Sequence, residues 1–303
     1  MVRGRWSKRA LAIYFLLFLL FLYGPMIVMA ILSLQGPLGN ITFPLKGFGL
    51  GWWRSLFDAS RPPFHAEEIR TAGEHSLWVG LASGGLVAML AFTLSMAFRR
   101  RFKLDGLLFY FVMLALMTPG FLLSLGTALF WRFLGALPDL WKTVLGTNVV
   151  WGLPFGFLVM LAVWNRYDRR VEEAARDLGA DTARTFREVT LPLIWTGLFG
   201  CFLFGFTLSW NEFDRSVLFL TGENTLPIQI FALTTGATVR PDLYALGTAT
   251  TLVSLLAIVI LLVVAAIRLR LRGAPVHAVE EELGLVPSEA QPAEAGGVGA
   301  RAE

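Results

Sequence analysis

The chain has 303 residues, of which 55% are hydrophobic, and a formal net charge of +4. Its 25 phenylalanines and 10 tryptophans add to a composition that excludes an ordinary soluble domain and is typical of a protein with several membrane spans. The small positive charge must then be interpreted through membrane topology, so no nucleic-acid partner is expected. A single cysteine, Cys201, excludes an intrachain disulfide.

The N-terminal part consists of a basic stretch and a long apolar run. Four basic residues between Arg3 and Arg9 precede Leu11–Leu34, whose 24 uncharged residues can cross a hydrocarbon layer of about 30 Å. This run is longer than a signal-peptide core, so we expect an uncleaved first span. Gln35–His75 is rich in Gly, Pro and aromatic residues, which predicts an interfacial, partly helical segment on the outer membrane face.

The second predicted span is Leu77–Phe98. It carries Gly80, Gly84 and Ala88 at intervals of four residues, a spacing that allows another helix to approach closely in lipid. The basic stretch Arg99–Lys103 follows it.

Prolines interrupt the third and fourth predicted spans. Leu107–Trp131 contains Pro119, which frees a backbone carbonyl and is tolerated where a helix is buried or lines a wet cavity. A simple kink and a place on a transport path both fit this proline. After an outer loop at Arg132–Thr147, the span Asn148–Trp164 is short and broken at Pro154, as in helices that line transport routes.

Two more spans and a tail complete the chain. The fifth span is predicted at about Leu193–Leu220, followed by an outer loop around Thr225–Pro227 and by a sixth span at Leu243–Ile267. The tail, 271–303, is rich in Gly, Ala, Pro and Glu and is expected to be disordered.

Basic residues are distributed unevenly between the two sides of these spans. Segments on the side of the N-terminus hold 17 Lys and Arg residues, and segments on the opposite side hold 7. Because cytoplasmic segments carry the excess of basic residues, we expect both termini, Arg99–Lys103 and Arg166–Glu188 to be cytoplasmic.

A charged segment, Glu172–Pro192, separates the fourth and fifth spans. Its first residues favour a helix, and Gly179 stands where a left-handed C-terminal cap is least costly. Asp181 offers an oxygen that can cap a second helix, which Pro192 would close. Small residues between the two helices would let another surface approach the backbone. Composition alone equally permits a solvated loop whose charges only fix the topology.

The same segment resembles the EAA loop of type I ABC importer permeases. The resemblance rests on Glu173-Ala174-Ala175, on Gly179 four residues later, and on Leu191-Pro192. In that family the loop forms a coupling helix that lies in a cleft of the cytoplasmic ATPase subunit. The residues that the resemblance and the local pattern assign to ATPase coupling are Glu172, Glu173, Ala174, Ala175, Leu178, Gly179, Ala180, Phe186, Leu191 and Pro192.

The resemblance covers about residues 11–270 and implies an all-α integral membrane protein with six transmembrane helices and a cytoplasmic coupling helix. It divides the chain into an N-terminal helix and outer amphipathic segment at 1–70, a five-helix core permease domain at 71–270, and a cytoplasmic tail at 271–303. The implied location is the bacterial inner membrane.

The resemblance also implies the partners. These are two cytoplasmic ABC ATPase subunits, a second homologous permease subunit, an extracytoplasmic solute-binding protein and membrane lipid. Since the ATPase subunits would hydrolyse ATP, this chain is expected to be non-catalytic and without a cofactor.

An enzyme and a secondary transporter are the competing classes of function. His65 and His75 fall in the predicted outer segment without a His-Glu-x-x-His pattern, so no catalytic centre or metal site is expected. The chain also lacks the Gly-x-x-x-x-Gly-Lys-Ser/Thr sequence of ATP-binding loops. Secondary transporters usually show repeated halves, and no repeat is detectable in these spans.

The only charges inside a predicted span are Glu212, Asp214 and Arg215. A carboxylate within a span is by default functional. On a continuous helix Ser209, Glu212 and Ser216 would share one polar face, while Arg215 could extend to the membrane interface. A structural role for Glu212, satisfied by a neighbouring helix or by the partner permease, is the alternative. The residues predicted to line the translocation path are Pro119, Pro154, Ser209, Asn211 and Glu212.

The substrate class is indicated by further resemblances. Arg176–Gly179 and Phe43–Trp53 resemble the polyamine-type (spermidine/putrescine) branch of these permeases, whereas Trp210–Phe213 resembles sugar-importer subunits. An acidic group near the outer mouth would attract a cation, most strongly where water is excluded. We therefore expect a polyamine or a related small organic cation. The alternatives are another solute of the same importer class, such as a sugar, opine, phosphonate or thiamine, or a secondary transporter.

Overall fold

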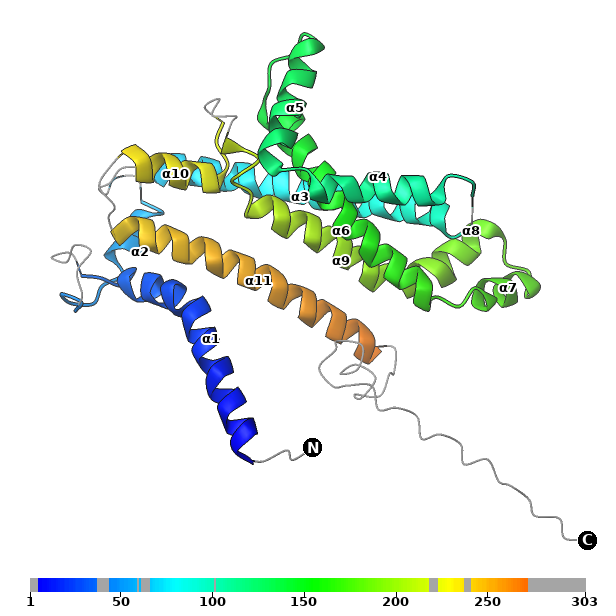
Figure 1. Ribbon diagram of the computed structural model, residues 1–303, viewed down its shortest axis with the longest axis horizontal. Coiled ribbons are helices and arrows are strands. Elements are labelled where there is room, and N and C mark those ends of the chain that lie inside the picture. Colours follow the sequence, from blue (N-terminus) through cyan, green and yellow to red (C-terminus); the bar gives the residue numbers. More distant parts are fainter. Residues whose placement is uncertain are drawn as a thin grey trace, which may run out of the picture. The chain divides into compact units, whose positions relative to one another are not determined.

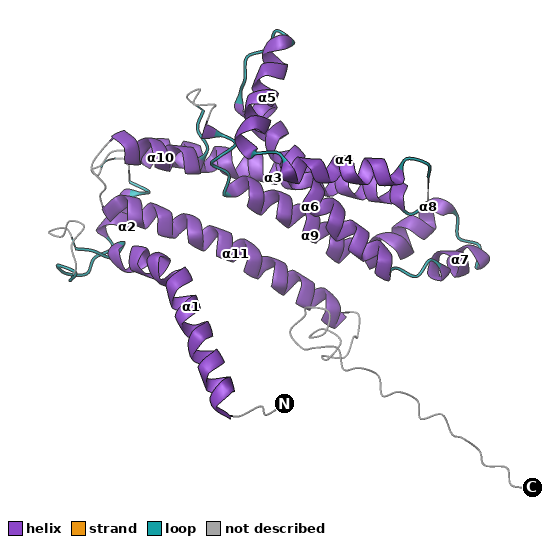
Figure 2. Cartoon of the chain, in the orientation of Figure 1, coloured by secondary structure: helices purple, strands orange, loops and turns teal. Residues whose placement is uncertain are grey.

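The computed structural model describes residues 5–36, 44–58, 60, 66–100, 102–217, 223–236 and 241–271. Within these ranges the chain is built from helices and loops (Figures 1 and 2), and one isolated bridge joins Gln35 and Phe48. The chain divides into two compact units, Met1–Ile258 and Val259–Glu303. In the second unit, the described residues form the end of the last helix. The predicted tail from 272 onward lies outside the described residues.

The elements follow one another along the chain as α1 Arg5–Leu32, α2 Gly51–Ser55, α3 Ala66–Phe98, α4 Asp105–Met117, α5 Gly120–Phe133, η1 Leu140–Val144, α6 Leu145–Arg166, α7 Arg170–Asp177, α8 Thr182–Thr185, η2 Phe186–Thr190, α9 Leu191–Trp210, α10 Leu226–Gly236 and α11 Pro241–Leu271. The two η elements are short π-helical turns, and each leads directly into the α-helix that follows it.

Helices α3, α6 and α9 lie alongside one another and form the centre of the first unit (Figure 1). Glycines allow this close packing. A Cβ atom added to Gly84 would lie 2.6 Å from the carbonyl oxygen of Phe202, and one added to Gly205 would lie 2.9 Å from the Cα atom of Gly84. One added to Gly80 would lie 3.1 Å from the ring of Phe206. Such close backbone approach favours helix association in lipid. The close packing predicted at Gly80 and Gly84 is confirmed.

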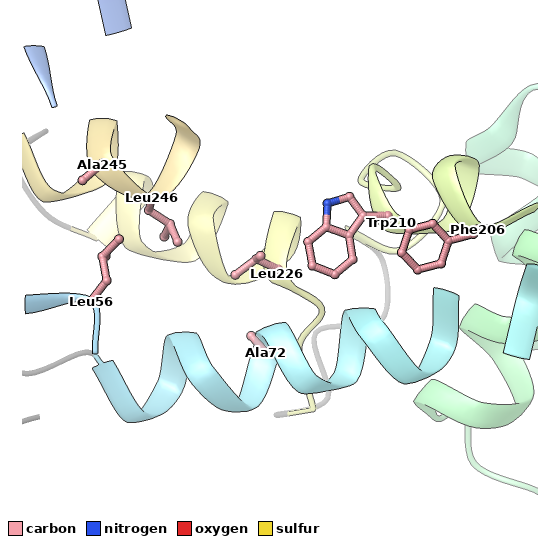
Figure 3. Close-up of a cluster of buried hydrophobic side chains, with 7 residues drawn as sticks. All are labelled: Leu56, Ala72, Phe206, Trp210, Leu226, Ala245 and Leu246. Atoms are coloured by element: carbon pink, nitrogen blue, oxygen red, sulfur yellow. The ribbon is translucent and has the colours of Figure 1, made fainter. Parts of the chain in front are cut away.

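A second packed region joins α2, α3, α9, α10 and α11. In Figure 3, the rings of Phe206 and Trp210 stack with their centroids 6.0 Å apart. The N–H group of Leu226 donates to the hydroxyl of Ser76 over 2.7 Å, so the start of α10 is fixed to α3. The outer loop predicted there is therefore in part a helix, and Pro227 in its first turn is compatible with that start. The buried residues are Leu56, Ala72, Phe206, Trp210, Leu226, Ala245 and Leu246.

Four stretches in the described ranges are long and apolar enough to cross a membrane, namely Arg9–Leu32, Ala66–Phe98, Leu140–Arg166 and Thr182–Trp210. A fifth span is counted if α4 and α5 act as a pair. Helix α11, with 31 residues, also has the length to span. The all-α membrane class is confirmed for this part of the chain, while the number six stays a prediction.

Pro119 and Pro154 were both predicted to interrupt a span, but only Pro119 does so. At Thr118 and Pro119 the backbone is extended, with ψ angles of 124° and 129°, and α4 and α5 lie at 105° to each other. The predicted third span is therefore two helices, because a residue before proline avoids the helical region. Pro154, in contrast, lies fully buried inside α6, which continues from Leu145 to Arg166. The predicted break in the fourth span is wrong.

The ends of two other spans also differ. Helix α9 stops at Trp210 and not near Leu220, since Asn211 leaves the helical region with φ −91° and ψ 10°. Glu212 and Ser216 therefore do not continue its face, and the single polar stripe is wrong. Pro192 does not close a helix, because η2 leads into α9 without a gap. The π turn η2 changes the backbone hydrogen-bond pattern just before Pro192, which has no N–H group to donate.

Candidate functional site

The segment between α6 and α9 forms a helix, a tight turn and a second helix, as predicted. Helix α7 ends with Gly179 in the left-handed region at φ 89°. The N–H of Ala180 donates to the carbonyl of Ala175 over 3.0 Å, and the N–H of Gly179 donates to that of Arg176 over 2.9 Å. This pair of bonds is the Schellman motif, which satisfies carbonyls left free at a helix end. The predicted cap at Gly179 is confirmed.

The second helix begins as the sequence predicts. The Oδ1 atom of Asp181 accepts a hydrogen bond from the backbone N–H of Arg184 over 2.7 Å, which is the third helical position. Arg184 and Glu188 then form an exposed ion pair at 3.0 Å across one turn. We call residues 168–190, which lie between α6 and α9, the coupling loop, after the role that the sequence predicts for it.

The coupling loop is attached to the membrane helices around Arg99, at the end of α3. The guanidinium of Arg99 donates to Oε1 of Glu172 over 2.8 Å, and the exposed fractions of the two side chains are only 14% and 13%. The same guanidinium lies over the rings of Trp164, 4.4 Å from the centroid, and Tyr167, at 5.3 Å. The backbone carbonyl of Arg99 accepts a hydrogen bond from Arg169.

Two hydroxyls complete this cluster. Thr190, at the end of η2, donates to Oε1 of Glu172 over 3.1 Å, and the hydroxyl of Tyr167 donates to Thr190 over 3.2 Å. We call Arg99, Trp164, Tyr167, Glu172 and Thr190 the Arg99 cluster. It connects the ends of α3 and α6 with the starts of α7 and α9.

The electrostatics of the Arg99 cluster favour an ionised Glu172. Burial alone raises the pKa of this carboxyl group, but the nearby Tyr167 hydroxyl, the hydrogen bonds from Arg99 and Thr190 and the charge of Arg99 outweigh it, so the net pKa lies below the ordinary value of 4.5. The pKa of Tyr167 is raised, first by burial and then by the neighbouring Glu172 carboxylate. At neutral pH the carboxylate is therefore charged and the phenol is neutral.

The opposite face of α7 is open and apolar. Leu178 is 89% exposed, Val171 is 43% exposed, and Ala174 lies between them on the same helical face. No residue of α7, all of which are described, is buried. An exposed apolar stripe on a short charged helix is typical of a surface that another protein covers.

The predicted coupling residues thus differ in how far they are exposed. Glu172 faces inward, whereas Glu173, Ala174, Leu178 and Gly179 are exposed. The residues that lie half-buried are Ala175, Ala180, Phe186, Leu191 and Pro192. Four residues of this site, Arg99, Trp164, Tyr167 and Thr190, are not predicted from the sequence, because the basic run after α3 carries only a topology signal and the other three belong to no motif.

A second polar site lies beyond the end of α9. Glu212 and Arg215 form an ion pair, with exposed side-chain fractions of 5% and 9%, and the backbone N–H of Arg215 also donates to Glu212. The guanidinium lies over the ring of Trp151 at 4.5 Å, and the carbonyl of Arg215 accepts from the hydroxyl of Ser124 in α5. The prediction that Arg215 extends to the interface is wrong, since it is buried and paired.

Glycine makes room for this pair. A Cβ atom on Gly120, the first residue of α5, would lie 2.8 Å from Cγ of Arg215. The aliphatic part of the arginine therefore passes directly over the start of α5. The alternative that Glu212 is satisfied within the protein fits this geometry.

The other predicted path residues have different surroundings. Ser209 is buried and accepts from the amide of Asn148 over 2.9 Å. Asn211 is exposed, and its side-chain oxygen accepts from Ser254 over 3.2 Å. Pro119 is exposed at the break between α4 and α5, and Pro154 is buried in α6.

Metal-binding chemistry finds no support in the described ranges, where no group of three or more His, Cys, Asp or Glu side chains could hold an ion. His75 lies in α3 and not in a loop, and its Nδ1 atom is 3.2 Å from the carbonyl oxygen of Asn224. His65 and His277 lie outside the described residues.

The chain is similar to known transport proteins. The spermidine/putrescine transport system permease protein PotC of Haemophilus influenzae is 27% identical over 243 residues, which are 79% of this chain and 90% of PotC. The putrescine transport system permease protein PotI of Escherichia coli is 25% identical over 256 residues, which are 82% and 86% of the two chains.

Similarity extends to the fold and to a protein family. A crystal structure of a bacterial ABC transporter involved in the import of the acidic polysaccharide alginate contains a chain with a TM-score of 0.58 at 18% identity, covering 88% of this chain and 98% of that one. The family described as the inner membrane component of binding-protein-dependent transport systems matches residues 89–272. Since this match extends over more than half of the sequence, the chain belongs to that family and is a permease subunit of an ABC transporter.

Proposed function

We propose that this chain is the permease subunit of an ATP-driven importer for polyamines, such as spermidine or putrescine, or for a related small organic cation. It acts with two cytoplasmic ATPase subunits, a second homologous permease and an extracytoplasmic binding protein. Both termini and the coupling loop lie in the cytoplasm. The observation that carries this proposal is the coupling loop, which presents an exposed apolar stripe on α7 and is attached to three membrane helices.

The geometry supports a mechanical role. When the ATPase subunits close, a helix seated in their surface moves with them, and the Arg99 cluster passes that movement to α3, α6 and α9. These helices are packed through backbone contacts, so they move as a body. The core domain at 71–270 would thereby change the side of the membrane to which the path is open.

The substrate class rests on the relatives, two of which are named for spermidine or putrescine. Within the chain, the path is proposed to pass Pro119, Pro154, Ser209, Asn211 and Glu212. Because Arg215 neutralises Glu212, the pair offers a cation no net charge. Selection of the cation is therefore assigned mainly to the binding protein.

Reconstitution tests this function. The permease would be assembled in proteoliposomes with its second permease and ATPase subunits, and radiolabelled spermidine would be presented with the binding protein outside and ATP inside. We expect ATP-dependent uptake that unlabelled putrescine reduces and maltose does not. Uptake of maltose with no uptake of either polyamine would refute the substrate class, and absence of ATP-dependent uptake of any solute would refute the importer.

A further inference from the structure

We infer that Arg99 is a positioning residue that holds the coupling helix α7 to the membrane helices and makes ATP hydrolysis productive for transport. The inference rests on the proposed function, because it assigns a role within the coupling of ATPase to permease. It concerns a residue outside the coupling loop, 73 positions before its partner Glu172.

Helix α7 has no apolar attachment to the membrane helices. None of its residues is buried, and the apolar side chains of Val171 and of Leu178, the residue that follows its end, are exposed. An isolated helix of eight residues is not stable in water. Its position relative to the membrane helices must therefore come from its two chain connections and from polar contacts.

The side chains of Glu172 and Arg99 provide such a contact. They lie 2.8 Å apart and are largely buried, whereas the pair of Glu172 with Arg176, at 4.0 Å, joins two residues of α7 itself and cannot attach the helix to α3. Exposed pairs contribute little, while buried, hydrogen-bonded pairs fix geometry. The pair of Arg99 and Glu172 is thus the main side-chain link between α3 and α7.

The side chain of Arg99 is itself held in one orientation. Its guanidinium lies over Trp164 and Tyr167, and the indole N–H of Trp164 donates to Ser95 in α3 over 2.9 Å. A planar guanidinium against aromatic rings has few other orientations. A force on α7 is therefore transmitted to the ends of α3 and α6 and is not absorbed by a flexible side chain.

The test uses the complete reconstituted transporter and measures spermidine transported per ATP hydrolysed. The variants are Arg99→Gln, Arg99→Lys and the exchange Arg99→Glu with Glu172→Arg. The control neutralises an exposed pair outside the coupling loop, Arg70→Gln with Glu74→Gln in α3, whose side chains are 70% and 62% exposed.

We expect Arg99→Gln to lower the ratio of transport to ATP hydrolysis at least tenfold while the complex still assembles. Arg99→Lys should lower it less, and the charge exchange should restore part of the loss. The control should keep the wild-type ratio. Hydrogen exchange should show faster exchange of the backbone amides of α7 in Arg99→Gln and unchanged exchange in α3 and α9.

A wild-type ratio in Arg99→Gln would overturn the inference. Failure of all three variants to assemble would overturn it too, because Arg99 would then serve the fold and not coupling. If the wild-type complex itself shows no ATP-dependent transport, the proposed function fails, which is a separate result from the comparison among variants.

Discussion

Glu212 illustrates how a charge in an apolar segment can be structural. From the sequence it is a carboxylate in a span, and by default such a group is functional. In the structure its oxygens accept from the guanidinium and the backbone N–H of Arg215, and Trp151 covers the guanidinium. A spacing of three residues allows this pair even on a helix, but spacing alone could not predict that the pair is buried against Trp151 and α5.

The first prediction concerns this pair. Glu212→Gln should lower the free energy of unfolding by about 3–5 kcal/mol, since it leaves Arg215 buried without a counter-charge. Glu212→Gln combined with Arg215→Gln should cost less than the single change. Thermal unfolding in detergent measures both. Asp214→Asn, at an exposed position, serves as the control and should melt with the wild type. A stable single variant with selectively reduced polyamine uptake would instead support a direct contact with substrate.

At the scale of the element, helix ends were predicted best where a capping residue marks them in the sequence. The cap at Gly179 and the start of α8 at Asp181 follow from residues within one turn, and both are confirmed. The end of α9 did not follow, because the apolar residues that resume at Val217 favour a continued span and the mostly polar residues Asn211–Ser216 can lie either on a helix face or in a buried turn. The separation of α4 from α5 was likewise underestimated, since a proline signals a break but not its angle.

The second prediction belongs to the packing of α3 against α9. Gly84→Ala should destabilise the protein by about 1–3 kcal/mol, because the new Cβ atom would meet the backbone oxygen of Phe202, which cannot move without the helix. Gly85→Ala provides a matched control in the next position, where a Cβ atom meets nothing within 4 Å. It should be neutral or slightly stabilising, as alanine favours helix. Equal melting temperatures for the two variants would contradict this account.

At the scale of the whole molecule, composition and motif together predicted the class of protein, and the family match confirms it. Composition identified a membrane protein because its apolar runs are too long for a soluble core. The motif identified a permease because several residues stand at fixed spacing. The Arg99 cluster could not be predicted, because its members come from four separate stretches of sequence that only the fold brings together.

The third prediction tests docking of the ATPase. Leu178→Glu should weaken co-purification of the ATPase subunits at least tenfold, since a charge would replace an apolar side chain that we propose the ATPase covers. The fold should be unaffected, as Leu178 is 89% exposed. The control is Leu104→Glu, 58% exposed in the turn before α4 and outside the coupling loop. Normal ATPase recovery with Leu178→Glu would mean that α7 is not the docking helix.

The exposed face of α7 also affects how long the permease would survive without its ATPase. If the loop is cytoplasmic, as proposed, a helix without buried residues would expose its peptide bonds to cytoplasmic proteases while it is uncovered. Once an ATPase subunit occupies that face, the same peptide bonds become inaccessible. Permease made in excess of its ATPase would then be removed at this loop, and the lifetime of the chain would itself enforce the composition of the transporter.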